Sequence, residues 1–317
     1  MKKKQSYIMN RAIVLFLCLF CLSPLLAQQS DSDRLRDLTM TVPQVPIDRI
    51  ELKVNSPLLL EGISAVAADK KGNIYVIHRP ANGDPVVVLD SRGNLLRSWG
   101  KGMFKIPHSI RIDPDGNVWT VDANTSMIYK FTPKGKKLLE INVGDVPNPS
   151  DDFCGATDVA FAQNGHVFVS DGYCNARIIE YDARGRKLRE WGKHGSDPGE
   201  FNVVHAIAIS PKGDVYVADR ENGRVQWFDQ QGKFLGQWTY GGQLYTVAFS
   251  KGGELYISTH PKGVSLDEES NVIKIDPANG KMLGRFEVRA HELSIAPDGA
   301  LLPATRGSQL LLFRLRK

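Results

Sequence analysis

Residues 213–220 read GDVYVADR, a glycine followed by a short run with the alternating character of a β-strand. The same kind of strand opens at six glycines along the chain, Gly72, Gly116, Gly165, Gly213, Gly253 and Gly299. The intervals between them are 44, 49, 48, 40 and 46 residues. Such intervals, with several short strands in each copy, are typical of β-propeller blades, which bury their faces only by stacking on neighbouring blades. Six copies therefore predict an all-β fold, a six-bladed β-propeller.

The segments around these strands support that prediction. Each copy reads as a short apolar strand, a turn, the glycine-led strand, another turn and a third strand that ends near an aromatic residue. Residues 113–116 (DPDG), 163–165 (QNG) and 211–213 (PKG) carry the residue types of tight turns. No long amphipathic helical stretch competes with the strands, and a closed ring of blades protects sheet edges from aggregation.

The N-terminus predicts an export signal. Three lysines and Arg11 precede an apolar run of 16 residues, 12–27, which is short for a spanning helix and ends at a plausible cleavage point after Ala27. A retained membrane anchor is the alternative. Residues 28–45 are polar and read as a flexible lead-in, so the expected domain is residues 46–317.

The net charge and the cysteine content limit the kinds of partner and the cellular compartment that can be expected. The net charge of +5 falls to +1 once residues 1–27 are removed, so nothing favours nucleic-acid binding. Cys18 and Cys21 leave with the leader, and only Cys154 and Cys174 remain. In an exported chain these two cysteines predict a single disulfide.

Three histidines recur at one position of alternate copies. They lie in 107–112 (PHSIRI), 204–209 (VHAIAI) and 290–295 (AHELSI), whereas the intervening copies, 156–161 (ATDVAF) and 244–249 (LYTVAF), hold threonine or tyrosine there. In a ring of six, every second blade places its imidazole about a third of a turn from the last. Three neutral imidazoles that converge on the axis form a zinc site with an open fourth position. We therefore predict that His108, His205 and His291 bind zinc.

The middle of the chain resembles a known family. Residues 153–160 (FCGATDVA), 167–178 (VFVSDGYCNARI) and 217–228 (VADRENGRVQWF), together with the histidine segments, closely resemble the lyase domain of peptidylglycine α-amidating monooxygenase. The likeness covers most of residues 60–230 and extends more weakly to 300. Several of its pieces are shared by NHL-repeat propellers in general, but the SDGYCN block, with Cys154 upstream and the three histidines in frame, is far more specific.

The resemblance implies a zinc-dependent lyase that cleaves the N–Cα bond of a C-terminal α-hydroxyglycine to give a peptide amide and glyoxylate. The family's zinc ligands fall on the three histidines, its catalytic tyrosine on Tyr173, and its active-site arginines on Arg79 and Arg220. Its disulfide falls on Cys154 and Cys174. Its structural calcium positions fall on the backbone carbonyls of Val66 and Ile110.

The chain departs from the family near its C-terminus. Where the family reads Met-Pro-His-Asp, this chain has Arg289-Ala290-His291-Glu292. Glu292 replaces a calcium-binding aspartate and could still bind a hard cation. Arg289 could pair with a carboxylate of the substrate. We expect the hydroxyglycine to come from a separate monooxygenase, since no copper monooxygenase is fused to this chain.

Two other functions remain open at this point. A non-catalytic NHL-repeat propeller would act as a binding module and would need no zinc. A calcium-dependent lactonase or esterase can also be built on a six-bladed propeller, but that chemistry favours carboxylate and amide ligands on the axis. Here the axial residues are histidines.

Overall fold

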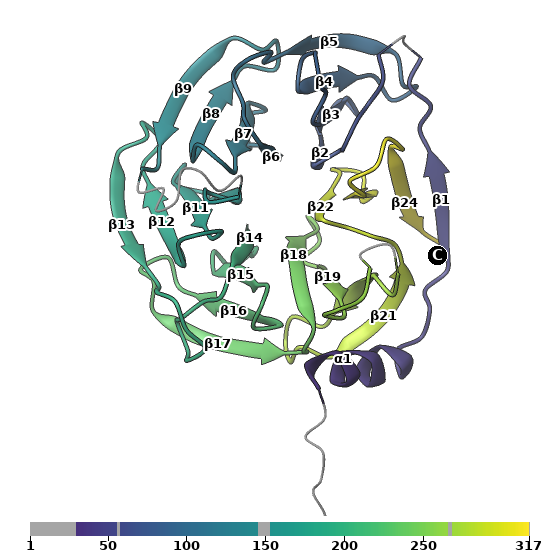
Figure 1. The fold of residues 1–317 in the computed structure, drawn as a ribbon, viewed down its shortest axis with the longest axis vertical. Coiled ribbons are helices and arrows are strands. Elements are labelled where there is room, and N and C mark those ends of the chain that lie inside the picture. Colours follow the sequence, from purple (N-terminus) through teal and green to yellow (C-terminus); the bar gives the residue numbers. More distant parts are fainter. Residues whose placement is uncertain (1–29, 56–57, 145–152, 266–267, 317) are drawn as a thin grey trace, which may run out of the picture.

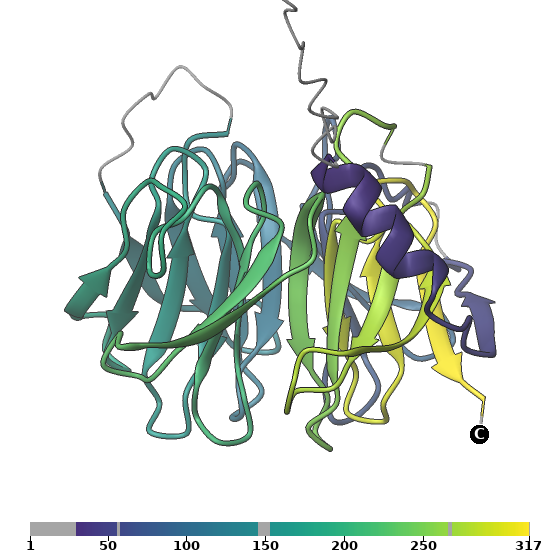
Figure 2. The same ribbon diagram turned by 90° about the horizontal axis from the view of Figure 1, so that it is seen from below.

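The computed structural model of this protein describes residues 30–55, 58–144, 153–265 and 268–316. Over these residues the chain forms six four-stranded antiparallel sheets, arranged as blades around a central axis (Figure 1). The strands run roughly along that axis when the ring is seen from its side (Figure 2). The predicted all-β, six-bladed propeller is confirmed.

In each blade the glycine-led strand is the second from the axis, and a fourth, outermost strand follows the three that the sequence pattern shows. The first blade comprises β2 (Ala65–Ala68), β3 (Ile74–Ile77), β4 (Val86–Leu89) and β5 (Leu95–Trp99). The second comprises β6 (Pro107–Ile112), β7 (Val118–Asp122), β8 (Met127–Phe131) and β9 (Lys137–Asn142). The third comprises β10 (Asp158–Phe161), β11 (Val167–Asp171), β12 (Arg177–Tyr181) and β13 (Lys187–Trp191).

The remaining blades follow the same order, but the last one borrows a strand from the start of the chain. The fourth blade comprises β14 (Val204–Ile209), β15 (Val215–Asp219), β16 (Arg224–Phe228) and β17 (Phe234–Thr239). The fifth comprises β18 (Gln243–Phe249), β19 (Leu255–His260), β20 (Asn271–Ile275) and β21 (Met282–Glu287). The sixth comprises β22 (Glu292–Ile295), β23 (Leu301–Ala304), β24 (Leu311–Leu315) and β1 (Ile47–Glu51). Pairing of β1 with β24 closes the ring.

Burial decreases from the axis outward, and this explains why the sequence pattern shows only three of the four strands in each blade. The second strands are almost wholly buried, because they are covered on both faces by neighbouring blades. The outermost strands are largely exposed; β13 (KLREW) has four exposed residues out of five. A strand that buries so little carries few apolar residues, so its periodic signal is weak.

The polar stretch 28–45 contains an α-helix that the sequence analysis does not predict. Helix α1 (Asp31–Met40) begins at Ser30, whose side chain accepts a hydrogen bond from the backbone N–H of Asp33 as an N-cap. Leu35 anchors the helix in the apolar cluster between the fourth and fifth blades. One buried leucine is too weak a pattern to reveal a helix of ten residues.

The predicted signal peptide, residues 1–27, lies outside the described residues. Within the described residues the helical content is too short and too polar for any helix to cross a membrane.

Candidate metal centre and active site

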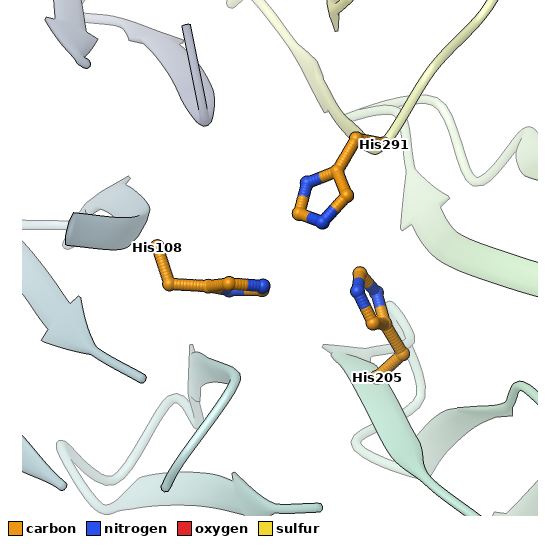
Figure 3. Close-up of side chains that lie close together, drawn as sticks. All are labelled: His108, His205 and His291. Atoms are coloured by element: carbon orange, nitrogen blue, oxygen red, sulfur yellow. The ribbon is translucent and has the colours of Figure 1, made fainter. Parts of the chain in front are cut away.

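The innermost strands carry irregularities at the histidine positions. Pro107 pairs with Asp122 and Ser109 with Val121, so His108 is the extra, unpaired residue of a bulge. The pairing of β14 with β15 skips His205 in the same way. Bulges re-aim side chains, and Figure 3 shows the imidazoles of His108 and His205 extending from different strands toward the same space, next to His291.

The third imidazole completes a compact cluster. His291 lies immediately before β22, where its N–H donates to the carbonyl oxygen of Ala304 at 2.9 Å. The ring centroids of the three histidines are 4.8 to 5.2 Å apart. One nitrogen from each ring lies within 4.8 Å of the others, and among the described residues this is the only group of three or more His, Cys, Asp or Glu side chains placed to share a metal ion. The predicted convergence of these rings is confirmed.

The alternation of histidines has a structural cause. Each imidazole makes a hydrogen bond from its Nδ1 atom to the backbone carbonyl of the residue at the equivalent position in the next blade. The pairs are His108 with Thr157 at 2.7 Å, His205 with Tyr245 at 2.7 Å, and His291 with Ser64 at 3.4 Å. Three blades thus supply imidazoles and the other three supply the carbonyls that orient them.

These contacts fix the chemical state of the rings. A carbonyl oxygen only accepts hydrogen bonds, so each Nδ1 carries the proton and each Nε2 keeps a lone pair. Burial is the main reason that the pKa values of all three histidines lie well below the ordinary value, and neighbouring cations lower them further. Neutral imidazoles whose outer nitrogen donates to a carbonyl are the usual form of histidine metal ligands. The donor set therefore fits a zinc ion with a free coordination position.

Tyr173 lies directly at the triad. Its Oη atom is 2.8 Å from Nε2 of His108 and 3.2 Å from Nε2 of His205. Burial raises the pKa of Tyr173 to about 12, although Arg220, Arg306 and Arg79 all act to lower it. The phenol is therefore protonated in the absence of a metal and donates to one of the two imidazoles.

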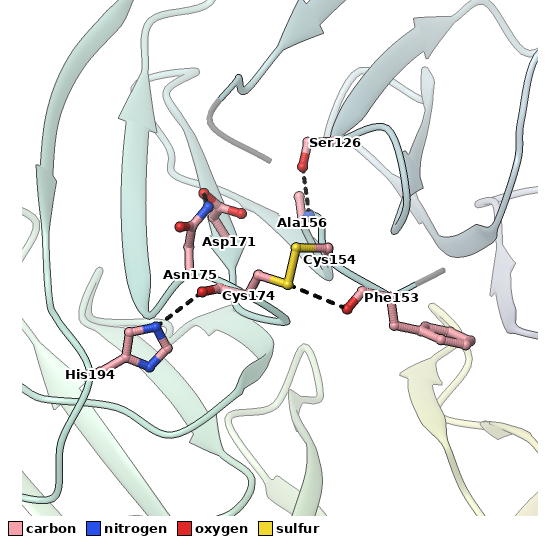
Figure 4. The surroundings of a disulfide bond; sticks show 8 residues. All are labelled: Ser126, Phe153, Cys154, Ala156, Asp171, Cys174, Asn175 and His194. Carbon is pink, nitrogen blue, oxygen red and sulfur yellow. Dashed lines mark hydrogen bonds between the residues drawn. A yellow bond between two sulfur atoms is a disulfide. The ribbon is translucent and has the colours of Figure 1, made fainter. Parts of the chain in front are cut away.

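The segment that carries Tyr173 is tied to its surroundings. A disulfide joins Cys154 to Cys174, as predicted (Figure 4). The Cys174 carbonyl also accepts a hydrogen bond from His194 at 3.0 Å. Gly172 is needed here, because a Cβ atom at that position would lie 2.0 Å from the backbone oxygen of Val204. The absence of a side chain lets the tyrosine segment approach the strand that bears His205.

Arg79 and Arg220 lie near the same tyrosine. The guanidinium of Arg220 lies over the rings of Tyr173 and Tyr245, at 5.7 and 5.3 Å from their centroids. Nε of Arg79 donates to the Pro107 carbonyl at 3.1 Å, and its buried Nη2 atom has no hydrogen-bond partner among the described residues. Burial, together with repulsion from Arg306, lowers the pKa of Arg79 to about 10, so the group remains cationic near neutral pH. Both cationic groups thus lie near Tyr173, and Nε of Arg220 also pairs with Oε1 of Glu221 at 2.8 Å.

Comparison with known proteins identifies a repeat and several similar sequences. Residues 153–181 and 201–228 match the NHL repeat. Over 54% of this chain and 21% of the relative, the sequence is 36% identical to peptidyl-glycine alpha-amidating monooxygenase of Mus musculus. It is 32% identical to peptidyl-alpha-hydroxyglycine alpha-amidating lyase 1 of Drosophila melanogaster, over 64% of this chain and 45% of that protein. A probable lyase of the same name from Caenorhabditis elegans is 29% identical, over 80% of this chain and 82% of that protein.

This chain contains NHL repeats, folds as a six-bladed propeller and is similar in sequence to proteins named as amidating lyases. The chain spans only about a fifth of the mouse monooxygenase.

Solved structures add support for the fold alone. The structure of a streptogramin B lyase superposes with a TM-score of 0.61 at 13% identity, covering 85% of this chain and 98% of that one. Virginiamycin B lyase from Staphylococcus aureus gives a TM-score of 0.58 at 12% identity, covering 86% and 100%.

Arg111 lies close to the predicted calcium site, because it contacts Glu292, one of the predicted calcium ligands. Nη2 of Arg111 lies 2.6 Å from Oδ2 of Asp158 and 2.7 Å from Oε2 of Glu292, so it links the second, third and sixth blades. Although burial acts to lower it, these two carboxylates raise the pKa of Arg111 overall. Burial and the proximity of Asp158 raise the pKa of Glu292 well above its ordinary value. The guanidinium thus already neutralises charge in this part of the channel.

These contacts do not fit a calcium ion. Val66 and Ile110, whose carbonyls the resemblance implicates, lie on the innermost strands β2 and β6 of adjacent blades. The carbonyl of Val66 already accepts a hydrogen bond from Ser294. The remaining predicted ligand, Glu292, is bound to Arg111. A divalent cation here would stand against a guanidinium that holds the same carboxylate.

Three residues near the site were not singled out from the sequence. Tyr245 holds the histidine position of the fifth blade, and its ring centroid lies 5.1 Å from that of His205. Arg111 follows His108 by three residues. Arg306 ends the repeat block GALLPATR just as Arg79 and Arg220 end theirs, GNIYVIHR and GDVYVADR. The shared repeat position was the available signal for Arg306. The further predicted residue, Arg289, lines the small hollow that also contains His291.

Proposed function

We propose that this protein is a zinc-dependent lyase that cleaves the N–Cα bond of a peptidyl-α-hydroxyglycine, or a closely related α-hydroxylated amide, to give an amide and glyoxylate. One observation carries the proposal: three neutral, pre-oriented imidazoles lie together beside Tyr173, with Arg220 against the tyrosine ring and Arg79 nearby. The names of the relatives support lyase activity in general.

The metal would be held by Nε2 of His108, His205 and His291, and the remaining coordination position would receive the substrate. Zinc in such a site supplies Lewis acidity, which lowers the pKa of a bound hydroxyl group. The three carbonyl hydrogen bonds hold the imidazoles in position before the metal arrives, so little reorganisation accompanies metal binding.

Side chains of the protein would then transfer one proton and bind one carboxylate of the substrate. The positive charge of Arg79, Arg220 and a bound metal would favour the ionised form of Tyr173. Its Oη atom would then accept the proton of the substrate hydroxyl as the carbinolamide collapses and return it to the leaving amide nitrogen. The electron pair of the O–H bond becomes the second bond of the glyoxylate carbonyl, and the electrons of the N–Cα bond leave with the amide nitrogen, which takes up a proton. Arg79 and Arg220 would bind the carboxylate of the hydroxyglycine and orient the breaking bond.

The test is turnover of a synthetic peptide that ends in α-hydroxyglycine, with glyoxylate as the measured product and with the zinc content of the protein determined in parallel. We expect one zinc per chain and product formation that a chelator abolishes and added zinc restores. His205→Ala should lower the rate at least about a hundredfold, because it removes a ligand, and loss of even a ligand's supporting hydrogen bond can cost that much.

The matched control is His166→Ala. His166 lies in the third blade, where its ring bonds Glu180 at 2.7 Å, and it is not part of the metal cluster. Its replacement should leave zinc content and rate unchanged. A zinc-loaded protein that forms no glyoxylate, or turnover that resists chelation, would contradict the proposal, and a zinc-free protein unaffected by His205→Ala would favour the non-catalytic binding module.

We also propose that the protein is exported and that its substrate comes from another protein. The disulfide between Cys154 and Cys174 supports an oxidising compartment. Some relatives are named as monooxygenases. We infer that a separate hydroxylating enzyme supplies the α-hydroxyglycine to this chain.

A further inference from the structure

The guanidinium group of Arg220 is held at its Nε end. Nε donates to Oε1 of Glu221 at 2.8 Å, and both side chains are partly buried. Among the described residues, neither terminal nitrogen of Arg220 makes a hydrogen bond. A guanidinium can bind a carboxylate side-on, with Nε and one terminal nitrogen, or end-on, with both terminal nitrogens. Because Glu221 occupies Nε, the end-on mode is the one left for the carboxylate of a substrate.

Two tyrosine rings contact the same guanidinium. Its central carbon lies 5.7 Å from the ring centroid of Tyr173 and 5.3 Å from that of Tyr245. Tyr245 lies on β18, the innermost strand of the fifth blade, whereas Arg220 follows β15 of the fourth. Contacts between a guanidinium and an aromatic face are attractive and favour particular orientations of the planar group. The neighbouring blade therefore restricts how Arg220 can turn.

Tyr245 also reaches Arg220 through hydrogen bonds. Its Oη atom donates to Oε1 of Gln243 at 3.2 Å, and Nε2 of Gln243 donates to Oε1 of Glu221 at 2.8 Å. This carboxylate oxygen is the one that accepts the hydrogen bond from Arg220. A glutamine amide can accept at its oxygen and donate at its nitrogen, so the bonds form a continuous chain. The chain links the phenol to the guanidinium through two side chains.

The hydroxyl group of Tyr245 is separate from the part of this residue that supports the metal centre. The backbone carbonyl of Tyr245 accepts the hydrogen bond from Nδ1 of His205, and the ring centroids of the two residues are 5.1 Å apart. Replacement of Tyr245 by phenylalanine keeps both the carbonyl and the ring. The contribution of the hydroxyl group can thus be measured while the imidazole keeps its partner.

We propose that Tyr245 is a positioning residue for substrate binding: through Gln243 and Glu221, its hydroxyl group fixes the guanidinium of Arg220 so that both terminal nitrogens meet the substrate carboxylate. This inference rests on the proposed lyase function, in which Arg220 binds the carboxylate of the hydroxyglycine. Glu221 offsets part of the charge of Arg220, so the strength of binding depends on the geometry of the two terminal hydrogen bonds. Loss of the hydroxyl group should therefore weaken binding of the carboxylate without removing any group that contacts it.

Binding of a stable analogue tests the inference without turnover. N-acetylglycine carries the carboxylate but lacks the hydroxyl group, so this reaction cannot cleave it. With zinc-loaded protein in a calorimeter, we expect Tyr245→Phe to bind it about two- to tenfold more weakly, the effect of losing one neutral hydrogen bond. Gln243→Leu should have a similar effect, and the double variant should be no worse than either single one, because all three break the same chain. Wild-type affinity in Tyr245→Phe, or effects that multiply in the double variant, would overturn the proposal.

Kinetics distinguish positioning from a part in the chemical step. With N-acetyl-α-hydroxyglycine as substrate, Tyr245→Phe should raise KM by the same factor as it weakens the analogue, while kcat and zinc content stay at the wild-type level. A fall in kcat at unchanged KM would contradict the inference. The matched control is Tyr240→Phe, which removes a buried phenol that donates to the Gly280 carbonyl at 2.8 Å outside this chain of hydrogen bonds. The control should bind and turn over as the wild type does, and thermal melting checks that each variant is folded.

The two measurements also separate this inference from the lyase function. If the wild type binds N-acetylglycine but forms no glyoxylate from the hydroxylated compound, the lyase function fails, and the affinities of the variants still decide the positioning. If the zinc-loaded wild type does not bind N-acetylglycine, Arg220 does not bind a carboxylate there and the positioning inference fails.

Discussion

Tyr173 shows how strongly one residue depends on its surroundings. Its Oη atom lies within hydrogen-bond distance of two imidazoles, and three arginines act on it electrostatically. Burial nevertheless raises its pKa to about 12. Removal of the hydroxyl group alone therefore separates its part in proton handling from its packing.

We predict that Tyr173→Phe lowers kcat by about a hundredfold to ten-thousandfold, the usual contribution of a positioned acid or base. Zinc content should stay at the wild-type level, because the imidazoles keep their carbonyl hydrogen bonds. Glyoxylate release and metal analysis on the same preparation measure both. A variant with wild-type kcat would show that the tyrosine handles no proton in the reaction.

The buried histidines predict a pH dependence of stability in the metal-free protein. Their folded-state pKa values lie below the unfolded value, so at acidic pH the unfolded chain binds more protons than the folded one. Stability should be constant above a pH of about 6.5 and fall below it, by up to about 1 kcal/mol per histidine for each pH unit.

Denaturant unfolding at pH 7.5 and 5.5 measures this effect, with His205→Gln as the comparison. The variant removes one titrating ring and should show a smaller loss between the two pH values. An identical loss in both proteins would mean that other groups cause the acid sensitivity.

At the scale of elements, two structural features position the side chains of the site. Bulges in β6 and β14 direct His108 and His205 toward the axis. The disulfide fixes the segment that follows β11, from which Tyr173 extends. The imidazoles therefore depend on the sheets, whereas the tyrosine depends on a covalent tie.

We predict that replacement of both Cys154 and Cys174 by serine impairs catalysis more than metal binding. The two cysteines are 20 residues apart, and loss of a bridge that closes a loop of this size costs about 3 kcal/mol of stability. The rate of glyoxylate formation should fall while zinc content is retained, because no metal ligand lies on the released segment. Loss of zinc together with activity would show that the segment also supports the triad.

At the scale of the whole molecule, charge inside the channel is balanced by contacts between blades. Arg111 from the second blade holds Asp158 of the third and Glu292 of the sixth. These groups are distant along the chain, and the circular arrangement of the blades brings them together.

We predict that the wild-type protein gains no thermal stability from added calcium, because the arginine already supplies positive charge at Glu292. Arg111→Met should be less stable by about 3 to 5 kcal/mol, the cost of breaking a buried ion pair from one side. Added calcium should recover part of that loss. Melting curves of zinc-loaded protein with and without calcium decide the matter, and a rise of several degrees in the wild type would restore the calcium site that the resemblance implies.

The sequence alone determined the architecture of this protein and the three histidines that could hold a metal ion. Glycine-led strands at regular intervals indicate blades because each strand must have the same local pattern to pack in the same way. The histidines could be found for the same reason, since a shared repeat position becomes a shared place around the axis. Tyr173 and the disulfide came from motif resemblance, and Arg306 could have come from the repeat position that it shares with Arg79 and Arg220.

Only the tertiary structure decided the features that depend on contacts between blades. The carbonyls that orient the imidazoles, the arginine that pairs with Asp158 and Glu292, and the closing of the ring by β1 all join residues far apart in the chain. Helix α1 was hidden because a single buried leucine, Leu35, holds it in place. Local periodicity records which face of a strand is buried, but it carries no information about which partner meets that face.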